Sequence, residues 1–438
     1  MSYIPHSDQD RILMLKELGL NSLDQLFHEI PEHLKLKKEL NIPCKLNEQA
    51  LFDFFLKASN QNTHAAELDW FLGAGLYDRY IPSVVGAVLS RGEFLTAYTP
   101  YQPELSQGYL QTIYEFQSMI AEFYGMEVSN ASVYDGATAS AEAALMAARL
   151  TGKHKILVSK TLHPHYKEVL KTYCWASSLE FCEIEINEKF VADHNTACFI
   201  LQTPNFYGIL ENLAQAKAIA IQKKALLIVI SDPVAMGLLK PPGEYGADIV
   251  VGEGQQLGIP MSFGGPLLGL FTTKKEYIRS MPGRIVGRTR DKKGKTGYAM
   301  TLRTREQDIR REKSTSNICT NQALMALAAT VYLTALGKNG IRSIATSTVQ
   351  NAQYAAAALT KVGAKMKFNG KFFGEFVLEL PENAAQVRDE LLDHSILAGL
   401  PLGDFEPDLK NCLLVAVTEI RTKKQIDRFA EKLEKVIS

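Results

Sequence analysis

Six short apolar segments, separated mostly by helical stretches, occupy the middle of this 438-residue chain. They cover residues 155–159, 180–184, 197–202, 226–231, 248–252 and 267–272. Strands that are apolar along their whole length, rather than at alternate positions, are typical of a mostly parallel sheet covered by helices on both faces. The pattern therefore predicts an α/β fold, in which ligands bind at the carboxyl ends of the strands.

The regions on either side of this pattern have a different character. Near the N-terminus, Ser7 and Asp10 form a predicted capping pair before an amphipathic segment that Gly19 ends, and residues 47–58 repeat the pattern. Beyond about residue 330 the predicted order is helix, strand, helix, strand, helix, over residues 345–362, 372–380, 384–394, 412–417 and 422–437. This order is typical of a small α+β domain.

A chain of this length exceeds the usual size of a single hydrophobic core, so several domains are expected. We predict a helical N-terminal extension (1–70), a large α/β domain (71–330) and a small α+β C-terminal domain (331–438). Residues 71–108 are rich in glycine, proline and aromatic side chains and show little periodicity. They are expected to form an ordered loop between short helices, and long ordered loops often carry function.

The composition argues against a nucleic-acid-binding, metal-binding or membrane-anchored protein. The 48 basic residues balance the 48 acidic ones, so charge gives no reason to expect nucleic acid or a membrane surface as partner. The six cysteines form no CxxC pair and have no metal-ligand spacing, which is typical of reduced thiols. The N-terminus has no apolar core of a signal peptide, and no apolar run reaches membrane-spanning length. We expect a cytoplasmic protein with no metal site and no membrane anchor.

Three motifs follow successive strand-like segments at the expected ligand edge. Gly136, Ala137 and Thr138 open a helix whose free amides can bind a phosphate, although the motif is also an ordinary helix start. His163 can stack on a flat heteroaromatic ring, or be a surface histidine in a turn. Asp232 can pair with a protonated pyridine nitrogen, or cap a helix before Pro233. Their order along the chain is typical of a site for pyridoxal phosphate (PLP).

A lysine is missing from this arrangement. In PLP enzymes of the aspartate aminotransferase fold (fold type I), the Schiff-base lysine lies in the loop after the strand that corresponds to residues 248–252 of this chain. This chain has Gln255 and Gln256 there. A primary amide is not nucleophilic enough to form an imine. Either the chain does not use PLP, or another chain supplies the amine.

Other lysines are poorly placed to replace it. In this fold, a helix and a strand lie between the aspartate, here Asp232, and the Schiff-base lysine. Lys240 comes before that helix and strand, too early in the chain. Lys274 and Lys275 follow the segment 267–272, which in this fold typically runs antiparallel, so they are expected at the opposite edge of the sheet. The chain is therefore not expected to form its own internal aldimine.

Two further segments have a composition that suits residues contributed to a binding site shared with another part of the protein or another chain. One is rich in aromatic and proline residues and contains Tyr98, Tyr101 and Gln102. The other offers the hydroxyls and amide of Thr315, Ser316 and Asn317, which can complete a phosphate or carboxylate pocket. For both segments, packing of a surface loop is the alternative. The neighbouring Arg310 and Arg311 are expected in an ion pair with Glu306 or Glu312 rather than on a ligand.

Several runs of the sequence closely resemble the glycine-cleavage P-protein family, the glycine dehydrogenases (decarboxylating). The likeness is to the N-terminal half, which is a separate subunit 1 in organisms with a split enzyme, and it covers nearly the whole chain. The matching runs are FLGAGLYDRYIP (71–82), SRGEFLTAYTPYQPE (90–104), ASVYDGATA (131–139), GADIVVG (246–252), GIPMSFGGP (258–266) and IRREKSTSNICT (309–320). Runs of this length are more specific than any single glycine motif.

The resemblance implies a fold type I chain that pairs with subunit 2, usually as an α2β2 heterotetramer. Subunit 2 would carry the lysine and PLP, and the isolated chain would be inactive. The implied reaction decarboxylates glycine on PLP and transfers the aminomethyl group to the lipoyl group of H-protein.

The resemblance also suggests which residues act. Tyr98, Tyr101 and Gln102 would contact glycine or the lipoyl group in the partner's site, and Thr315, Ser316 and Asn317 would lie near the partner's PLP phosphate. Gly136, Ala137, Thr138, His163 and Asp232 would be the vestige of a second site. Two alternatives stay open: a non-catalytic scaffold or regulatory subunit of the same complex, and an autonomous PLP enzyme that uses Lys240 or another lysine.

Overall fold

The computed structural model describes residues 5–97, 99–185 and 194–438. The chain divides into two compact units, Met1–Thr63 and His64–Ser438. The first unit contains the helices α1 (Asp8–Glu17) and α2 (Glu48–Ser59) and two short 3-10 turns, and no residue of either helix is buried. Ser7 and Asp10 form the predicted capping box of α1, and Asn47 caps α2.

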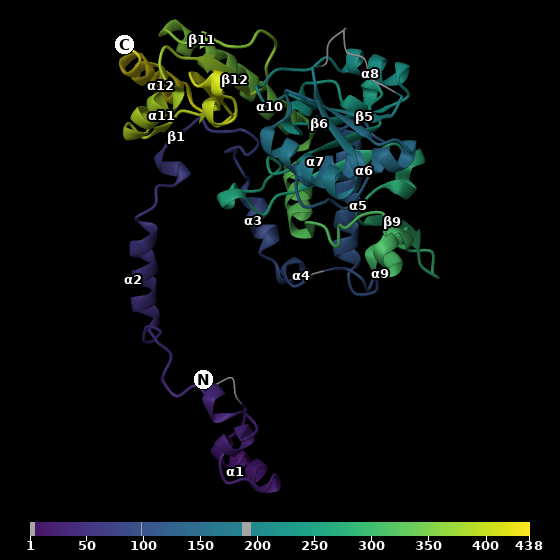
Figure 1. The fold of residues 1–438 in the computed structure, drawn as a ribbon, viewed down its shortest axis with the longest axis vertical. Coiled ribbons are helices and arrows are strands. Elements are labelled where there is room, and N and C mark those ends of the chain that lie inside the picture. The colour runs from purple at the N-terminus through teal and green to yellow at the C-terminus, as the bar shows by residue number, and fades with distance from the viewer. Residues whose placement is uncertain (1–4, 98, 186–193) are drawn as a thin grey trace. The chain divides into compact units, whose positions relative to one another are not determined.

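The second unit is built on a seven-stranded sheet, of which β5 and β6 are labelled in Figure 1. The strand order is β2-β8-β7-β6-β5-β3-β4. The strands are β2 (Val128–Ser129), β3 (Lys155–Ser159), β4 (Glu180–Ile184), β5 (Thr196–Thr203), β6 (Leu226–Ser231), β7 (Ile249–Glu253) and β8 (Gly269–Thr273). The pairs among β3 to β7 are parallel, and β8 is antiparallel to both of its neighbours. All six predicted strands are confirmed, and so is the antiparallel direction of the last one.

Alternate residues of the central strands enter two separate cores, one on each face of the sheet. Along β6, Leu227 and Val229 join one core, and Ile228 and Ile230 join the other. The first core contains residues of α5 (Gln107–Phe123), α8 (Leu213–Gln222) and α10 (Ala323–Lys361). The second contains residues of α6 (Gly136–Thr151) and α7 (Pro164–Ala176). Burial on both faces explains why these strands are continuously apolar in the sequence.

The C-terminal part carries a four-stranded antiparallel sheet of order β11-β12-β15-β14. Its elements are β11 (Lys365–Met366), β12 (Glu375–Glu379), α11 (Ala384–Asp393), β14 (Leu400–Pro401), β15 (Cys412–Ala416) and α12 (Lys423–Val436). The strand β13 (Ile396–Leu397) pairs instead with β1 (Asp69–Trp70). The predicted boundary at residues 330 and 331 falls within α10, a helix interrupted at Gly337, and this division stays a prediction.

Several elements of the structure have no counterpart in the sequence prediction. They include α5, α9 (Gln307–Arg310) and the antiparallel hairpin of β9 (Ile285–Arg290) and β10 (Thr296–Thr301). The short helices α3 (Ser83–Leu89) and α4 (Gly92–Leu95) lie in the glycine- and aromatic-rich segment, where an ordered loop between short helices was expected.

The helix α10 is long and apolar enough to cross a membrane, by length and composition alone. No such segment was expected from the sequence. Packing explains the composition, because α10 contacts α3, α5 and α12 and contributes buried residues such as Leu327 and Tyr332 to the core. A central core helix and a membrane helix have similar apolar content.

All six cysteines are free. Cys174, Cys198 and Cys412 are buried, and burial raises the pKa of the Cys174 thiol to about 11. A protonated, buried thiol is chemically inert. Over residues 5–97, 99–185 and 194–438, no group of histidine, cysteine and carboxylate side chains is arranged to hold a metal ion.

Candidate functional site

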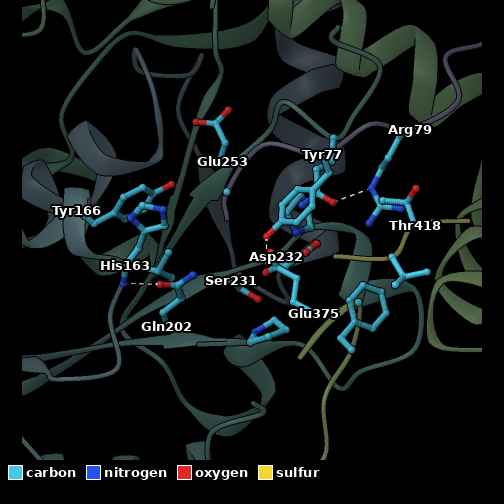
Figure 2. Close-up of a pocket in the computed structure, with 18 residues that line it drawn as sticks. Tyr77, Arg79, His163, Tyr166, Gln202, Ser231, Asp232, Glu253, Glu375 and Thr418 are labelled. Atoms are coloured by element: carbon cyan, nitrogen blue, oxygen red, sulfur yellow. Dashed lines mark hydrogen bonds between the residues drawn. The ribbon is translucent and has the colours of Figure 1, made fainter. Parts of the chain in front are cut away.

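A cavity of about 50 Å³ lies at the carboxyl ends of β5, β6 and β7. The lining comes from four parts of the chain: the ends of these strands, the start of α7, the loop at 71–82, and the C-terminal part. Figure 2 shows His163 and Tyr166 on one side of the cavity, with Asp232, Tyr77 and Glu375 close together. The predicted ligand edge is therefore the place where His163 and Asp232 meet.

The expected phosphate cradle already holds a carboxylate. Gly136 N, at the start of α6, donates to Glu253 Oε2 at 2.9 Å. Thr138 N and its hydroxyl donate to Asp135 at 2.8 and 2.9 Å. A Cβ on residue 136 would lie 2.3 Å from the Tyr166 hydroxyl, so close packing explains this glycine without a phosphate. A dianionic phosphate placed here would face two carboxylates.

Glu253 is held by three backbone amides. Besides Gly136, Gln255 N and Leu268 N donate to its Oε1 at 2.9 and 3.0 Å. Burial raises the pKa of Glu253 to about 7, in spite of these bonds, and the nearby Asp135 adds to the rise. The Glu253 carboxyl thus accepts hydrogen bonds from backbone amides at the start of α6 and after β7. In phosphate-binding proteins, the phosphate accepts such bonds at the start of a helix.

His163 has a structural hydrogen-bonding role. His165 N donates to its Nδ1 at 3.1 Å, so the ring carries its proton on Nε2 and donates to Ala74 O at 2.9 Å. Burial lowers the pKa of His163 to about 4, which keeps the ring neutral. Phe206 packs edge-on against the ring, at 4.9 Å between centroids. The imidazole therefore ties the start of α7 to the loop at 71–82.

Asp232 fulfils the helix-capping alternative while it lines the cavity. Its Oδ1 accepts from Val234 N at 2.7 Å and from Ala235 N at 3.2 Å, at the start of the 3-10 turn Val234–Gly237. The carboxylate is positioned by this turn, so its place at the end of β6 does not by itself indicate a pyridine partner.

Gln255 and Gln256 are buried, and both form side-chain hydrogen bonds. Gln255 accepts from Tyr77 N at 3.0 Å and donates to Tyr77 O at 3.2 Å and to Ile259 O at 2.8 Å. Gln256 accepts from Arg79 Nε at 2.7 Å. Both amides, in the segment where fold type I enzymes carry their lysine, therefore bind the loop at 71–82.

Sequence reasoning missed the partners of this loop. The hydroxyl of Tyr77 donates to Glu375 Oε2 at 2.8 Å, and Ala74 N donates to Oε1 of the same carboxylate at 2.7 Å. Burial raises the pKa of Glu375 to about 7, and it also raises the pKa of Tyr77. The unusual composition of residues 71–82 marks the loop, but nothing in the sequence links it to Glu375, nearly 300 positions away.

The residues of this cavity do not fit PLP. The described residues that line it include no lysine, its volume has room for only a few water molecules, and the phosphate position holds Glu253. Lys240 lies beside Glu244, at 3.9 Å, and over the Tyr245 ring. Lys274 pairs with Asp248, which precedes β7 at the opposite edge of the sheet. No cofactor chemistry is therefore assigned to this cavity.

The two other predicted segments converge on Arg284, which directly precedes β9. Arg284 donates to the Tyr101 hydroxyl at 2.6 Å, and it lines a small cavity of about 10 Å³ together with Thr315 and Ser316. Gln102 and Asn317 are exposed. Tyr98 lies outside the described residues. The sequence contained no indication of Arg284, because its partners come from distant parts of the chain.

The expected ion pairs of Arg310 and Arg311 are not formed within the described part of the chain. Glu306 instead lies 3.6 Å from Arg284 Nε, and the carboxylate of Asp308 pairs with Arg303. Arg310 lies four positions after Glu306, at the other end of the short helix α9. The Glu306 carboxylate points toward Arg284 instead.

Comparison with known proteins agrees with the resemblance. Residues 1–433 match the family described as Glycine cleavage system P-protein. The chain is 49% identical to the probable glycine dehydrogenase (decarboxylating) subunit 1 of Halalkalibacterium halodurans over 439 residues, with 98% of each chain covered. It is 50% identical to the protein of the same description from Brevibacillus brevis, with 99% of this chain and 98% of the relative covered.

Solved structures agree on the fold. A crystal structure of the glycine decarboxylase (P-protein) of the glycine cleavage system, in inhibitor-bound form, matches with a TM-score of 0.90 and 41% identity over the whole of both chains. A glutamate decarboxylase from Lactobacillus brevis matches with a TM-score of 0.65 at 15% identity, over 94% of this chain and 97% of that chain, which supports the fold alone. The predicted fold type I architecture is thus confirmed, and the chain belongs to the glycine cleavage system P-protein family.

Proposed function

We propose that this chain is the subunit without a Schiff-base lysine in a two-chain glycine decarboxylase whose partner subunit binds PLP. The observation that carries the proposal is the state of its own cavity: the fold is retained, but the chain's own side chains fill the cofactor position. Gln255 and Gln256 bind the loop at 71–82, and Glu253 lies where a phosphate would. The relatives' description as subunit 1 supports a second subunit.

In the proposed reaction, the bond between the α-carbon of glycine and its carboxyl group breaks and CO₂ leaves. PLP, held by the partner, supplies the electron sink that this cleavage needs. The aminomethyl carbon then forms a bond to one sulfur of the lipoyl disulfide of H-protein. The S–S bond breaks, and the second sulfur leaves as a thiol, so the disulfide is reduced by the electron pair from decarboxylation.

The contribution of this chain is assigned to its exposed loops. Tyr98, Tyr101 and Gln102 are proposed to contact glycine or the lipoyl group in the partner's site. Thr315, Ser316 and Asn317 are proposed to approach the partner's PLP phosphate. Exposure supports both roles, because Tyr101 retains 46% of its accessible surface and Gln102 and Asn317 are exposed.

Assembly and compartment belong to the same proposal. An α2β2 heterotetramer, docking of lipoylated H-protein and a cytoplasmic location follow from the family resemblance and from the six free cysteines. Neither nucleic acid nor a membrane is proposed as a partner.

The purified chain is expected to be colourless and to retain no PLP. After incubation with PLP and borohydride reduction, intact-mass measurement should show no covalent adduct at Lys240 or at any cavity residue, because the lining offers no amine. The PLP-binding partner subunit, treated in parallel, provides the positive control. A yellow chain with one specific reduced adduct would support the autonomous-enzyme alternative.

A Tyr101→Ala variant, assembled with the partner subunit, is expected to lose roughly tenfold to a hundredfold in glycine–CO₂ exchange in the presence of H-protein. The basis is the loss of an exposed side chain that makes contacts of about 1.5–3 kcal/mol in the partner's site. Size-exclusion chromatography should show unchanged assembly. Tyr354→Ala is the matched control, since Tyr354 is a half-exposed tyrosine on α10 that bonds Asp427. Unchanged exchange in the Tyr101 variant would favour the scaffold alternative.

A further inference from the structure

Tyr101 is fixed on its loop by a buried arginine. Arg284 Nη2 donates to the tyrosine hydroxyl at 2.6 Å, and the guanidinium carbon lies 5.1 Å from the ring centroid. Arg303 lies over the same ring at 5.5 Å. A half-exposed tyrosine on a loop would otherwise be free to change rotamer. A charge-assisted hydrogen bond of this length restricts both the position and the direction of the hydroxyl.

Arg284 is itself held rigidly. Its side chain is only 6% exposed, Nη1 donates to the Thr320 hydroxyl at 2.7 Å, and Nη2 also donates to Cys319 O at 2.7 Å. Its backbone carbonyl accepts from Ala131 N at 2.8 Å. These bonds connect Arg284 to the body of the second unit through several segments. The position of Tyr101 is therefore set by the core rather than by its own loop.

The cluster around Arg284 has unused hydrogen-bonding capacity. Seven buried side-chain atoms of the described residues have no hydrogen-bond partner, and four of them lie on these segments: Thr99 Oγ1, Arg284 Nε, Arg303 Nε and Glu306 Oε1. A buried unpaired polar atom costs about 1–3 kcal/mol. Polar atoms of this kind are free to bond water or a partner chain.

We propose that Arg284 is a positioning residue: it holds the phenol of Tyr101 in the orientation in which it reaches the glycine site of the partner subunit. The proposal rests on the function proposed above, since it requires Tyr101 to act in that site. Arg284 is buried, and its proposed effect on the reaction is exerted through Tyr101. Positioning of this kind raises the rate because the group does not have to be ordered during the reaction.

A double-mutant cycle tests the proposal in the assembled complex, with kcat and KM for glycine measured by glycine–CO₂ exchange. Tyr101→Phe removes the hydroxyl, and Arg284→Lys keeps the charge but loses the planar, multiple hydrogen bonds. Each variant is expected to lower kcat by roughly tenfold to a hundredfold, as for the loss of one charge-assisted bond. The double variant is expected to lose no more than the larger single loss, because the two residues act as one unit.

Controls separate positioning from folding. Arg421→Lys changes an arginine whose side chain is equally buried, at 6% exposure, and which pairs with Asp78 away from Tyr101. It is expected to lower thermal stability while kcat stays unchanged. If Arg284→Lys does not fold, Thr320→Val replaces it, since this change removes one of the bonds that hold Arg284. A smaller, equally non-additive loss is then expected.

Each other outcome is decisive. Losses that multiply in the double variant, or an Arg284→Lys complex with full activity beside an impaired Tyr101→Phe complex, would overturn the positioning role and leave the proposed function intact. Full activity of the Tyr101→Phe complex would remove the role of the hydroxyl and the positioning role together. If Tyr101→Ala is also fully active, the proposed contribution of this loop fails too.

Discussion

An Arg79→Met variant is expected to lose about 3–5 kcal/mol of unfolding free energy, the usual cost of leaving one charge of a buried ion pair without its partner. The side chain of Arg79 is 4% exposed and that of its partner Glu419 is 9% exposed. Arg79 also donates to Gln256 at 2.7 Å and to Thr348 at 3.2 Å. Without the guanidinium, the Glu419 carboxylate stays buried, and Tyr80 N, at 3.1 Å, is the one donor left to it among the described residues.

The loss is measured as the shift of the urea midpoint, followed by fluorescence and by circular dichroism. Arg388→Met is the control, because Arg388 forms an exposed pair with Asp389 that contributes less than about 1 kcal/mol. Adding Glu419→Gln to Arg79→Met should recover a large part of the loss, since the unpaired charge is its main cause. A shift no larger than that of Arg388→Met, or a double variant that is less stable still, would contradict this account.

The stability of the chain is expected to fall as pH rises from about 5 to 7. Burial raises the pKa of both Glu253 and Glu375 to about 7, from an ordinary value of 4.5. Between these values the folded chain binds more protons than the unfolded chain, so the free energy of unfolding decreases as pH increases. At 1.36 kcal/mol per pKa unit, the decrease reaches about 3 kcal/mol for each carboxyl group. By about pH 8 both groups are largely ionised, and no further decrease is expected from them.

Thermal unfolding at pH 5 and pH 8, in buffers of matched ionic strength, measures this effect. Charged neighbours act on both groups: Asp135 on Glu253, and Asp232 and Arg79 on Glu375. The test is therefore the difference between the two pH values in the unchanged chain and in Glu253→Gln and Glu375→Gln. Each substitution should reduce that difference even if it lowers stability at both pH values. A chain that is more stable at pH 8, or variants with an unchanged difference, would refute the assignment.

Local patterns predicted the fold well. Mostly apolar segments correspond to β3 and β6 at their full bounds, because strands buried on both faces need apolar residues at nearly every position. The capping box at Ser7 was predicted because it depends on residues three positions apart. The hairpin of β9 and β10 was missed, since β10 is partly exposed along its length and lacks an apolar run.

The candidate site was predicted only in part. His163 and Asp232 were placed at the correct edge of the sheet, because Asp232 directly follows β6 and His163 lies in the short connection after β3. Their hydrogen-bond partners were not predictable, since Ala74 O reaches His163 from a loop about 90 residues earlier in the chain. Glu253 was missed although it directly ends β7, because an isolated glutamate gives no indication that it will face the start of α6.

The sequence by itself determined that this chain lacks a Schiff-base lysine, that its sheet is parallel with one antiparallel strand, and that it resembles the P-protein family. These properties depend on residue identity and on short-range order, which a sequence displays directly. Only the tertiary structure decided what fills the cofactor position and what holds Tyr101. Both answers depend on contacts between distant segments: Glu253 with Gly136, Gln256 with Arg79, and Arg284 with Tyr101. Packing of the whole chain creates these contacts, and no local pattern encodes them.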